Sequence, residues 1–352
     1  MARVPFDFDD DSPKELVLSP KGRLLEVRWP LLGVSILQTR GGDRQDDYVD
    51  LEDVAKNTPG FCQHGMFGYS IDQFSEFFAY DQSGNFSHEI ELTFGNVEVT
   101  IGRVTPLGIW LFDNYHDDDY LPDWPDLHSI RILGASAEKA ETYLLNALIT
   151  ARRSLKVVLT LCPIQWSIPR LEEESTQDEG SVDDPIVHRA AHAIAEIEPL
   201  RLFYKGLEEG DPASAFLQFY RVLEYYAALL IQDEVAKLRW DRNLSARGFL
   251  IEMLKAAARD ERAQLLRIVT RLGDKVLFED AKTGKLCNSA TPEDLANAMY
   301  AFRNAIVHAK YDFRTTIHAD SILESSAVAA AWRGLAEELA ARSLQRLGQP
   351  ET

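Results

Sequence analysis

The chain has 352 residues, of which 45% are hydrophobic and 26% are charged, a composition typical of folded globular proteins and long enough for two domains. No apolar run approaches the roughly 20 residues of a membrane-spanning helix, and acids stand where a secretory signal would have its apolar core, so we expect a cytoplasmic protein without membrane contact. Cys62, Cys162 and Cys287 lie far apart without CxxC spacing, which argues against a disulfide framework and a cysteine zinc site.

The net charge of −19 belongs to one half of the chain. Residues 200–352 hold 21 Lys+Arg and 21 Asp+Glu, so residues 1–199 carry the entire excess of acids. Such an acidic half repels nucleic-acid phosphates at low ionic strength. We therefore expect any RNA contact in the C-terminal half, and a protein partner or trigger at the acidic N-terminal half.

The first 170 residues are predicted to form a β-rich domain with a sensing or regulatory role. Leu24–Trp29 and Gly33–Thr39 are short runs rich in apolar and β-branched residues. Glu89–Phe94 and Val97–Ile101 alternate between apolar and polar residues, and Gly95-Asn96 between them is typical of a hairpin turn. Further strand candidates are Gly108–Phe112 and Ser129–Leu133. The spacing favours a sandwich or barrel and leaves the topology open.

One long helix is expected near the end of this domain. The segment SAEKAETYLLNALITARRSL, residues 136–155, has helical periodicity over roughly 17 residues, and the strand-like KVVLTL follows it. Residues 171–199 are predicted to form an acidic linker, followed by a connecting helix from about Pro185. His188 and His192 would share a face of that helix, but no HExxH pattern surrounds them, so we expect no metal and no cofactor.

Residues 200–352 are predicted to be helical. Asp211 followed by Pro212 begins a helix in which apolar residues recur every three or four positions, and Thr291-Pro292, followed by two acids, begins another. The remaining predicted elements are helices over Ala246–Ala258, Asp260–Leu272 and about Ser321–Leu347, and a polar loop over Phe278–Ala290. The predicted fold class is α+β, a β-rich N-terminal domain followed by an all-α bundle.

The helix that begins at Pro292 carries the segment Phe302-Arg303-Asn304-Ala305-Ile306-Val307-His308. An arginine followed by a polar residue, three further residues and a histidine resembles the R-x4-6-H signature of HEPN domains, where it lies late in a helix of a four- or five-helix bundle. The segment FYRVLEYYAALL, residues 219–230, is similar to the first helix of the ApeA-like HEPN branch. The resemblance covers roughly residues 200–345 and does not extend to the N-terminal half.

The resemblance implies RNA cleavage without a metal, in which the RNA 2′-hydroxyl attacks the neighbouring phosphate. His308 would transfer protons, because histidine titrates near neutral pH, and Arg303 would hold the phosphate oxygens. Asn304 occupies the family's polar position and would orient His308 or a phosphate oxygen. Glu224 is the candidate acid that orients Arg303. Lesser candidates are Tyr311 as a supporting residue, for which packing is the alternative, and Lys310 and Arg314 as phosphate contacts.

Helix geometry constrains how Arg303 and His308 can act together. Arg303 and His308 are five residues apart, which places them about 140° apart around a regular helix. Either the helix distorts near His308, or two copies of the motif meet across a symmetric interface. HEPN domains resemble the second case, so we expect a homodimer with a two-fold axis near this helix. The predicted function is an endoribonuclease of an anti-phage or toxin-like defence system.

Two alternatives stay open. In the first, the bundle is a non-catalytic dimerisation and protein-binding module, Arg303 pairs with Glu224 or another acid, and His308 caps a carbonyl. A solvent-open basic cleft around these residues would favour the enzyme, and burial with satisfied partners would favour the module. In the second, the N-terminal domain is a ligand-binding sandwich that uses aromatic residues for stacking. The aromatic candidates are Trp110, Trp124 and Tyr120.

Overall fold

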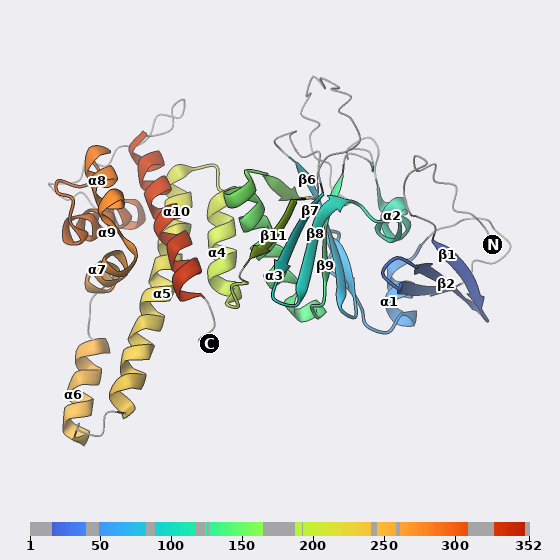
Figure 1. Ribbon diagram of the computed structural model, residues 1–352, viewed down its shortest axis with the longest axis horizontal. Helices are drawn as coiled ribbons and strands as arrows, with labels where there is room; N and C mark the ends of the chain where they lie inside the picture. Colours follow the sequence, from blue (N-terminus) through green and yellow to red (C-terminus); the bar gives the residue numbers. More distant parts are fainter. Residues whose placement is uncertain are drawn as a thin grey trace. The chain divides into compact units, whose positions relative to one another are not determined.

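The computed structural model describes residues 16–39, 49–81, 89–116, 124, 127–164, 187–191, 193–240, 245–257, 261–308 and 327–348, without the side chains of residues 114, 187–191, 231–237, 240, 254–257 and 308. The chain divides into two compact units, Met1–Ala193 and Ile194–Thr352 (Figure 1). All described strands lie in the first unit, and the described elements of the second unit are helices. The β-rich N-terminal part and the helical C-terminal part are as the sequence predicts.

The first unit begins with a small antiparallel sheet of β1 (Val17–Lys21), β2 (Leu24–Trp29) and β3 (Val34–Thr39). The helix α1 (Leu51–Asn57) lies along the outer edge of β3. Thr58, directly after α1, exchanges hydrogen bonds with both backbone groups of Leu37, and Asp53 on α1 accepts from the amide and hydroxyl of Thr39. These side chains satisfy the open edge of β3, which would otherwise be available for pairing with another strand.

The larger sheet has eight strands. Its order is β11-β7-β8-β9-β6-β5-β4, and β10 pairs with the far end of β6. The pairings are antiparallel except for β11 with β7, which is parallel. The strands are β4 (Phe61–Gln63), β5 (Gly68–Ile71), β6 (Phe74–Asp81), β7 (Ile90–Phe94), β8 (Val97–Arg103), β9 (His128–Leu133), β10 (Leu159–Leu161) and β11 (Val187–Ala191). The hairpin predicted at Gly95-Asn96 is confirmed, because Phe94 pairs with Val97 and Gly95 has a φ of +66°.

The predicted long helix of the first unit is confirmed. It forms α3 (Ala137–Thr150), which continues into a π-helical turn (Ala151–Leu155) and packs against β5, β6 and β9. The predicted strand Gly108–Phe112 is wrong, because these residues belong to a helix, α2 (Pro106–Phe112). Thr105 caps this helix by accepting a hydrogen bond from the Gly108 amide, and Pro106 occupies its first turn. A short apolar run does not by itself distinguish a buried strand from a buried helix. Here the cap at Thr105 is the feature that indicates a helix.

The predicted connecting helix from about Pro185 is also wrong over the residues of β11. Val187 to Ala191 pair in register with Ile90 to Phe94, so this segment is an edge strand of the first unit. Hydrogen bonds to a strand almost 100 residues away decide this conformation, and the local sequence gives no sign of that partner. The first unit therefore extends well past residue 170. The predicted helix face shared by His188 and His192 is lost, and His192 lies outside the described residues.

The second unit contains α4 (Ile197–Glu208), α5 (Pro212–Trp240), α6 (Ala246–Ala257), α7 (Glu261–Leu272), α8 (Lys275–Thr283), α9 (Pro292–His308) and α10 (Ala327–Leu347). The long helix α5 is central and packs against α4, α7 and α10 (Figure 1). Its predicted cap is confirmed, because Asp211 accepts a hydrogen bond from the Ser214 amide at 2.8 Å. The predicted loop Phe278–Ala290 is partly wrong, because α8 runs to Thr283 after Asp274 caps its first turn.

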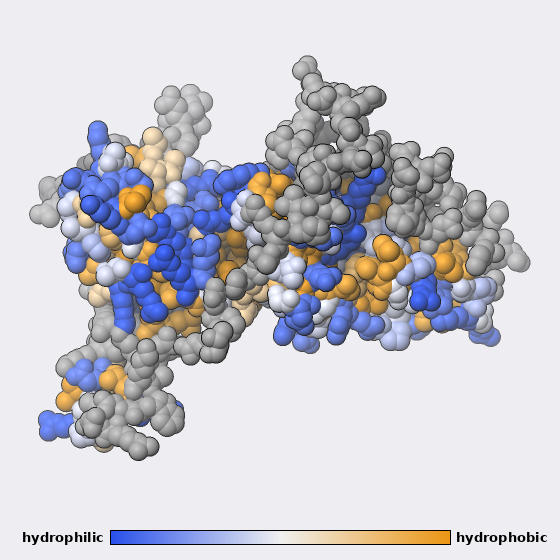
Figure 2. Space-filling view, in the orientation of Figure 1, coloured by the Kyte–Doolittle hydropathy of each residue, from blue (hydrophilic) through white to orange (hydrophobic). Residues whose placement is uncertain are grey.

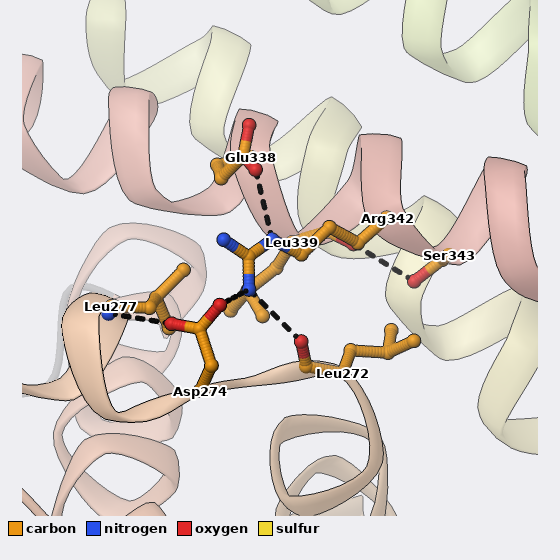
Figure 3. A network of polar contacts seen from close by, with 7 residues as sticks. All are labelled: Leu272, Asp274, Leu277, Glu338, Leu339, Arg342 and Ser343. Atoms are coloured by element: carbon orange, nitrogen blue, oxygen red, sulfur yellow. Dashed lines mark hydrogen bonds and ion pairs between the residues drawn. The ribbon is translucent and has the colours of Figure 1, made fainter.

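Arg342 on α10 holds the turn between α7 and α8 (Figure 3). Its Nη1 donates to the carbonyl of Leu272, the last residue of α7, at 3.1 Å, and to Asp274 at 2.8 Å. Its Nε donates to Glu338, one turn earlier on α10, at 2.8 Å. One guanidinium thus satisfies a helix-end carbonyl and the N-cap residue of the next helix. This contact ties the end of α7 to α10, and α7 contributes to the site described below.

None of the helices in the described part of the chain combines the length and apolar character needed to cross a bilayer.

Candidate functional site

Aromatic packing sets the rotation of α9 in the bundle. Phe302 stacks on Trp332 of α10 with ring centroids 5.3 Å apart, and meets Phe216 of α5 edge-on at 4.9 Å. Because Phe302 faces these two helices, the next residue along the helix is turned by about 100°. Arg303 therefore reaches the junction of α5, α7 and α9, where it can contact side chains from all three helices.

The guanidinium of Arg303 lies between two carboxylates and beside an aromatic ring. Its Nη2 is 3.8 Å from Glu224 Oε1 on α5 and 3.9 Å from Glu261 Oε2 on α7. Its Nη1 donates to Asn304 Oδ1 at 3.0 Å, and its Cζ lies 5.9 Å from the centre of the Tyr220 ring. The two ion pairs are longer than hydrogen bonds, and 18% of the Arg303 side chain is exposed. The two acids therefore hold the arginine loosely, and it remains in contact with solvent.

Electrostatics at this junction favour proton uptake by one of the acids. Burial raises the pKa of Glu224, Arg303 opposes this shift, and Glu261 adds to it. Burial also raises the pKa of Tyr220, and Glu224 adds to that shift. A carboxyl with a raised pKa gains a proton more readily when an anion approaches and competes for the same arginine. Burial and Glu261 therefore make the carboxyl of Glu224 easier to neutralise than an ordinary glutamate.

The other sequence candidates are only partly visible. His308 is the last residue of α9, and α9 is a regular α-helix up to it, so the distortion considered from the sequence does not occur in the described backbone. The side chain of His308 is not described, and Lys310, Tyr311 and Arg314 lie outside the described residues. Along α9, the five-residue separation from Arg303 corresponds to about 7.5 Å.

The outward face of α9 carries small and apolar side chains. Ala301 and Val307 are exposed, Val307 to 46%, and Asn304 between them is partly exposed. These positions recur at three-residue spacing and so form one stripe along the helix, next to Arg303. The stripe thus consists of one small, one polar and one β-branched side chain next to Arg303.

Sequence reasoning missed Tyr220 and Glu261. Glu261 begins α7, and nothing in its local sequence distinguishes it from other acids in the first turn of a helix. Tyr220 lies in the segment that carries the family resemblance. Because its neighbours are apolar, the sequence predicts it only as a core residue. Glu224 is where the sequence expected it, within reach of Arg303. Its role in orienting Arg303 stays a prediction.

The proposed ligand-stacking aromatics of the first unit have packing partners. Trp110 is 9% exposed and donates to Gln38, and Trp124 donates to Asp113 at 3.0 Å while stacking on His116. Both side chains belong to or pack against the apolar core of this unit. Tyr120 lies outside the described residues. The described geometry therefore favours packing over stacking on a ligand.

A surface cavity of about 520 Å³ lies on α7, lined by Ala263, Leu266, Arg267, Thr270 and Arg271. Among the described residues, no group of three or more His, Cys, Asp or Glu side chains is placed to hold a metal ion. The chain matches no known family model, no curated protein and no solved structure. The junction around Arg303 must therefore be interpreted from its own geometry.

Proposed function

We propose that the helical unit is a metal-independent endoribonuclease of the HEPN kind, acting in an anti-phage or toxin-like defence system. In this proposal Arg303 binds the scissile phosphate and stabilises the negative charge that builds on it. His308 accepts the proton of the RNA 2′-hydroxyl or returns one to the leaving oxygen. Asn304, which already accepts a hydrogen bond from Arg303, keeps the guanidinium turned toward the phosphate.

The observation that carries the proposal is the loose approach of two acids to Arg303. They lie 3.8 and 3.9 Å away, so a phosphate oxygen at hydrogen-bond distance would interact more strongly with the guanidinium than either carboxylate does. The pKa of Glu224 is raised, which lowers the cost of displacing it. By comparison, the two carboxylates that contact Arg342 each lie 2.8 Å from it.

The homodimer is part of the proposal. An α9 that stays regular to His308 cannot bring both side chains of one copy to the same point, because they are about 140° apart. A two-fold pairing along the stripe of Ala301, Asn304 and Val307 would bring the His308 of a second copy toward Arg303. The acidic first unit then serves a protein partner or trigger and not the RNA.

The test is RNA cleavage by the purified chain in the presence of EDTA. We expect cleavage that survives chelation and leaves 2′,3′-cyclic phosphate ends, the product of attack by a 2′-hydroxyl. Arg303→Ala and His308→Ala should each lower the rate by at least about 100-fold. Arg271→Ala removes an exposed arginine from the same bundle and serves as the matched control. RNA that stays intact with the wild-type protein, alone and in extracts of infected cells, would contradict the proposal.

Mixing two inactive variants tests the shared site. If Arg303 of one copy works with His308 of the other, a heterodimer of Arg303→Ala with His308→Ala contains one complete site. Mixing them should then restore part of the activity, up to about a quarter of the wild-type rate for random exchange of subunits. If the mixture does not regain activity although subunit exchange is verified, both residues of a working site belong to one chain.

A non-catalytic dimerisation and protein-binding module is the second candidate. The observation in its favour is that Arg303 joins α5, α7 and α9 through Glu224 and Glu261. In that case Arg303→Ala should lower the stability of the bundle and leave RNA untouched. Comparing thermal unfolding with RNA cleavage for the same variant therefore separates the two functions.

A further inference from the structure

Arg262 is a second arginine at the junction of α7 and α9. It is exposed, and its Nε donates a hydrogen bond to Oδ1 of Asn297 on α9. The residue before it, Glu261, is the acid of α7 that approaches Arg303. The start of α7 therefore contacts α9 twice, at two residues that are six positions apart. The helix rise places these two contacts about 9 Å apart along α9.

Asn297 directs the guanidinium of Arg262 without neutralising it. An amide oxygen is an uncharged acceptor, and no carboxylate in the described part of the chain lies at ion-pair distance from Arg262. Arg303, by contrast, has Glu224 and Glu261 beside it. The hydrogen bond to Asn297 uses Nε, so both Nη groups of Arg262 are left to form the two parallel hydrogen bonds that suit a phosphate. Arg262 therefore has the charge and the donors of an anion-binding residue, and a neighbouring helix holds it in place.

The stretch of α9 between the two contacts carries no charge. Residues 298–302 are Ala, Met, Tyr, Ala and Phe, and of these Tyr300 lies three positions from both Asn297 and Arg303. Residues three positions apart are neighbours on a helix surface, so the partly exposed Tyr300 lies between the two contacts. Figure 2 shows mainly hydrophilic surface over α7, α8 and α9 on the face in view. A phosphate chain that passes from Arg303 to Arg262 thus meets an aromatic ring on α9 and no carboxylate of that stretch.

We propose that Arg262, positioned by Asn297, binds a second phosphate of the RNA whose scissile phosphate is bound by Arg303. The inference rests on the proposed function and names its substrate class, an RNA strand that continues past the cleaved bond over the α7–α9 junction. Glu261 is next to both arginines, and because its side chain is 51% exposed it can turn into solvent as the strand binds. Arg262 contributes affinity and takes no part in the chemical step.

The experiment measures how tightly the full chain binds an RNA that it cannot cleave. A 2′-O-methyl oligouridylate of ten nucleotides lacks the attacking hydroxyl and still presents several phosphates in a row. Fluorescence anisotropy with this labelled probe gives the affinity at several salt concentrations. Each contact to a phosphate of a single strand adds about 0.7 to the slope of log affinity against log salt concentration, because it releases bound counterions. The slope thus reports phosphate contacts, which the loss of a purely structural arginine does not change.

Removing Arg262 should have a different effect from loosening it. Arg262→Ala should lower the slope by about 0.7 and weaken binding by about three- to tenfold at low salt. Arg262→Lys should keep the slope, because the charge remains. Asn297→Ala should also keep the slope but weaken binding by about two- to fivefold, because the arginine is then ordered only when RNA binds. Arg271→Ala, which removes an exposed arginine at the other end of α7, is the matched control and should change neither value.

Cleavage assays separate this inference from the proposed function. Arg262→Ala should lower kcat/KM through a higher KM, whereas Arg303→Ala should lower kcat. A wild-type protein that binds the probe but cleaves no RNA contradicts the proposed function, and the slopes then decide the second phosphate site alone. The inference is overturned if Arg262→Ala keeps the wild-type slope, or if the wild type does not bind the probe. Far-UV circular dichroism checks that the variants fold, because Arg262 and Asn297 join α7 to α9.

Discussion

Glu76 in the first unit and Arg303 in the second differ in how closely their charged partners and donors approach. In the first unit Glu76 has no exposed surface and accepts three hydrogen bonds, from the Tyr69 hydroxyl at 2.8 Å and from the amide and hydroxyl of Thr105. In the second unit Arg303 is partly exposed and approaches its two acids only to 3.8 and 3.9 Å. All three donors of the first arrangement lie within hydrogen-bond distance of the carboxylate, whereas neither acid of the second lies that close to the guanidinium.

This difference separates structural polar groups from groups that can bind something else. A buried carboxylate is tolerated only when its hydrogen bonds are complete, and it then has little to offer a ligand. Under the proposed function, the guanidinium of Arg303 would exchange its more distant acids for a phosphate of the RNA. The following predictions test this distinction by the loss of stability at each site, from the largest to the smallest.

The largest loss is expected for Glu76→Ala. It leaves the Tyr69 hydroxyl and both Thr105 donors buried without an acceptor, and Thr105 also caps α2. The free energy of unfolding should fall by about 3–5 kcal/mol. Denaturant titration followed by tryptophan fluorescence measures it. Glu98→Gln on β8, an exposed acid of the same sheet, is the control. A loss below about 1 kcal/mol would show that this network is not structural.

A smaller loss is expected for Arg342→Ala, which removes three hydrogen bonds that are partly exposed. Water replaces part of each bond, so the expected loss is about 1–2 kcal/mol. Arg342→Lys should recover less than half, because an ammonium cannot reproduce the fork that spans Leu272 and Asp274. Arg346→Ala, an exposed arginine one turn later, should be neutral in the same titration.

The sequence predicts an element well when the signal for it is local. The hairpin at Gly95-Asn96, the cap at Asp211 and the helix after Ser136 each depend on a few neighbouring residues. The strand β11 does not, and it was predicted wrongly, because its conformation is decided by pairing with β7. The helix α2 was also predicted wrongly although its cap at Thr105 and Pro106 is local, because the apolar run that follows fits a strand as well as a helix.

The candidate site follows the same rule. Arg303 and Asn304 are neighbours on one helix, so the six-residue motif predicts both. Glu224 was predicted from the resemblance of the α5 segment to a HEPN helix. Glu261 is supplied by a third helix, α7, and its contact with Arg303 depends on the packing of α7 against α9 and α5. No pattern in the sequence of α7 predicts that contact. Three-dimensional packing, and not spacing along the chain, brings this acid to the arginine.

A titratable group in the first unit adds a dependence on pH. His64 Nε2 lies 2.5 Å from the Ser70 hydroxyl, which is 2.7 Å from that of Ser75, and its ring packs on Phe77 at 5.0 Å. Burial lowers the pKa of His64, and Glu141 partly opposes this shift. The unfolded chain therefore binds the proton first as the pH falls below about 6.5, and stability decreases.

The expected result is a stability profile of the wild-type protein that declines from pH 7 toward pH 5, less steeply in His64→Gln. The change should be smaller than that of the Arg342 variant, because it comes from the shifted pKa of a single half-buried imidazole. Denaturant titrations at several pH values measure the slope. Identical slopes for the two proteins would show that protonation of His64 does not destabilise the fold.

The smallest loss of stability is expected for Glu261→Gln. Its side chain is 51% exposed and its carboxylate lies 3.9 Å from Arg303, so the free energy of unfolding should change by less than about 0.5 kcal/mol. Affinity for anions should nevertheless increase, because one competitor for the guanidinium is gone. Fluorescence anisotropy with a short RNA should show binding about two- to fivefold tighter. Glu293→Gln makes the same change of charge at an exposed residue of α9 and separates a local effect from a change in net charge. If Glu261→Gln instead destabilises the bundle by more than about 1 kcal/mol and leaves RNA binding unchanged, Arg303 belongs with Glu76 among the structural groups, because its acids are then partners that no phosphate replaces.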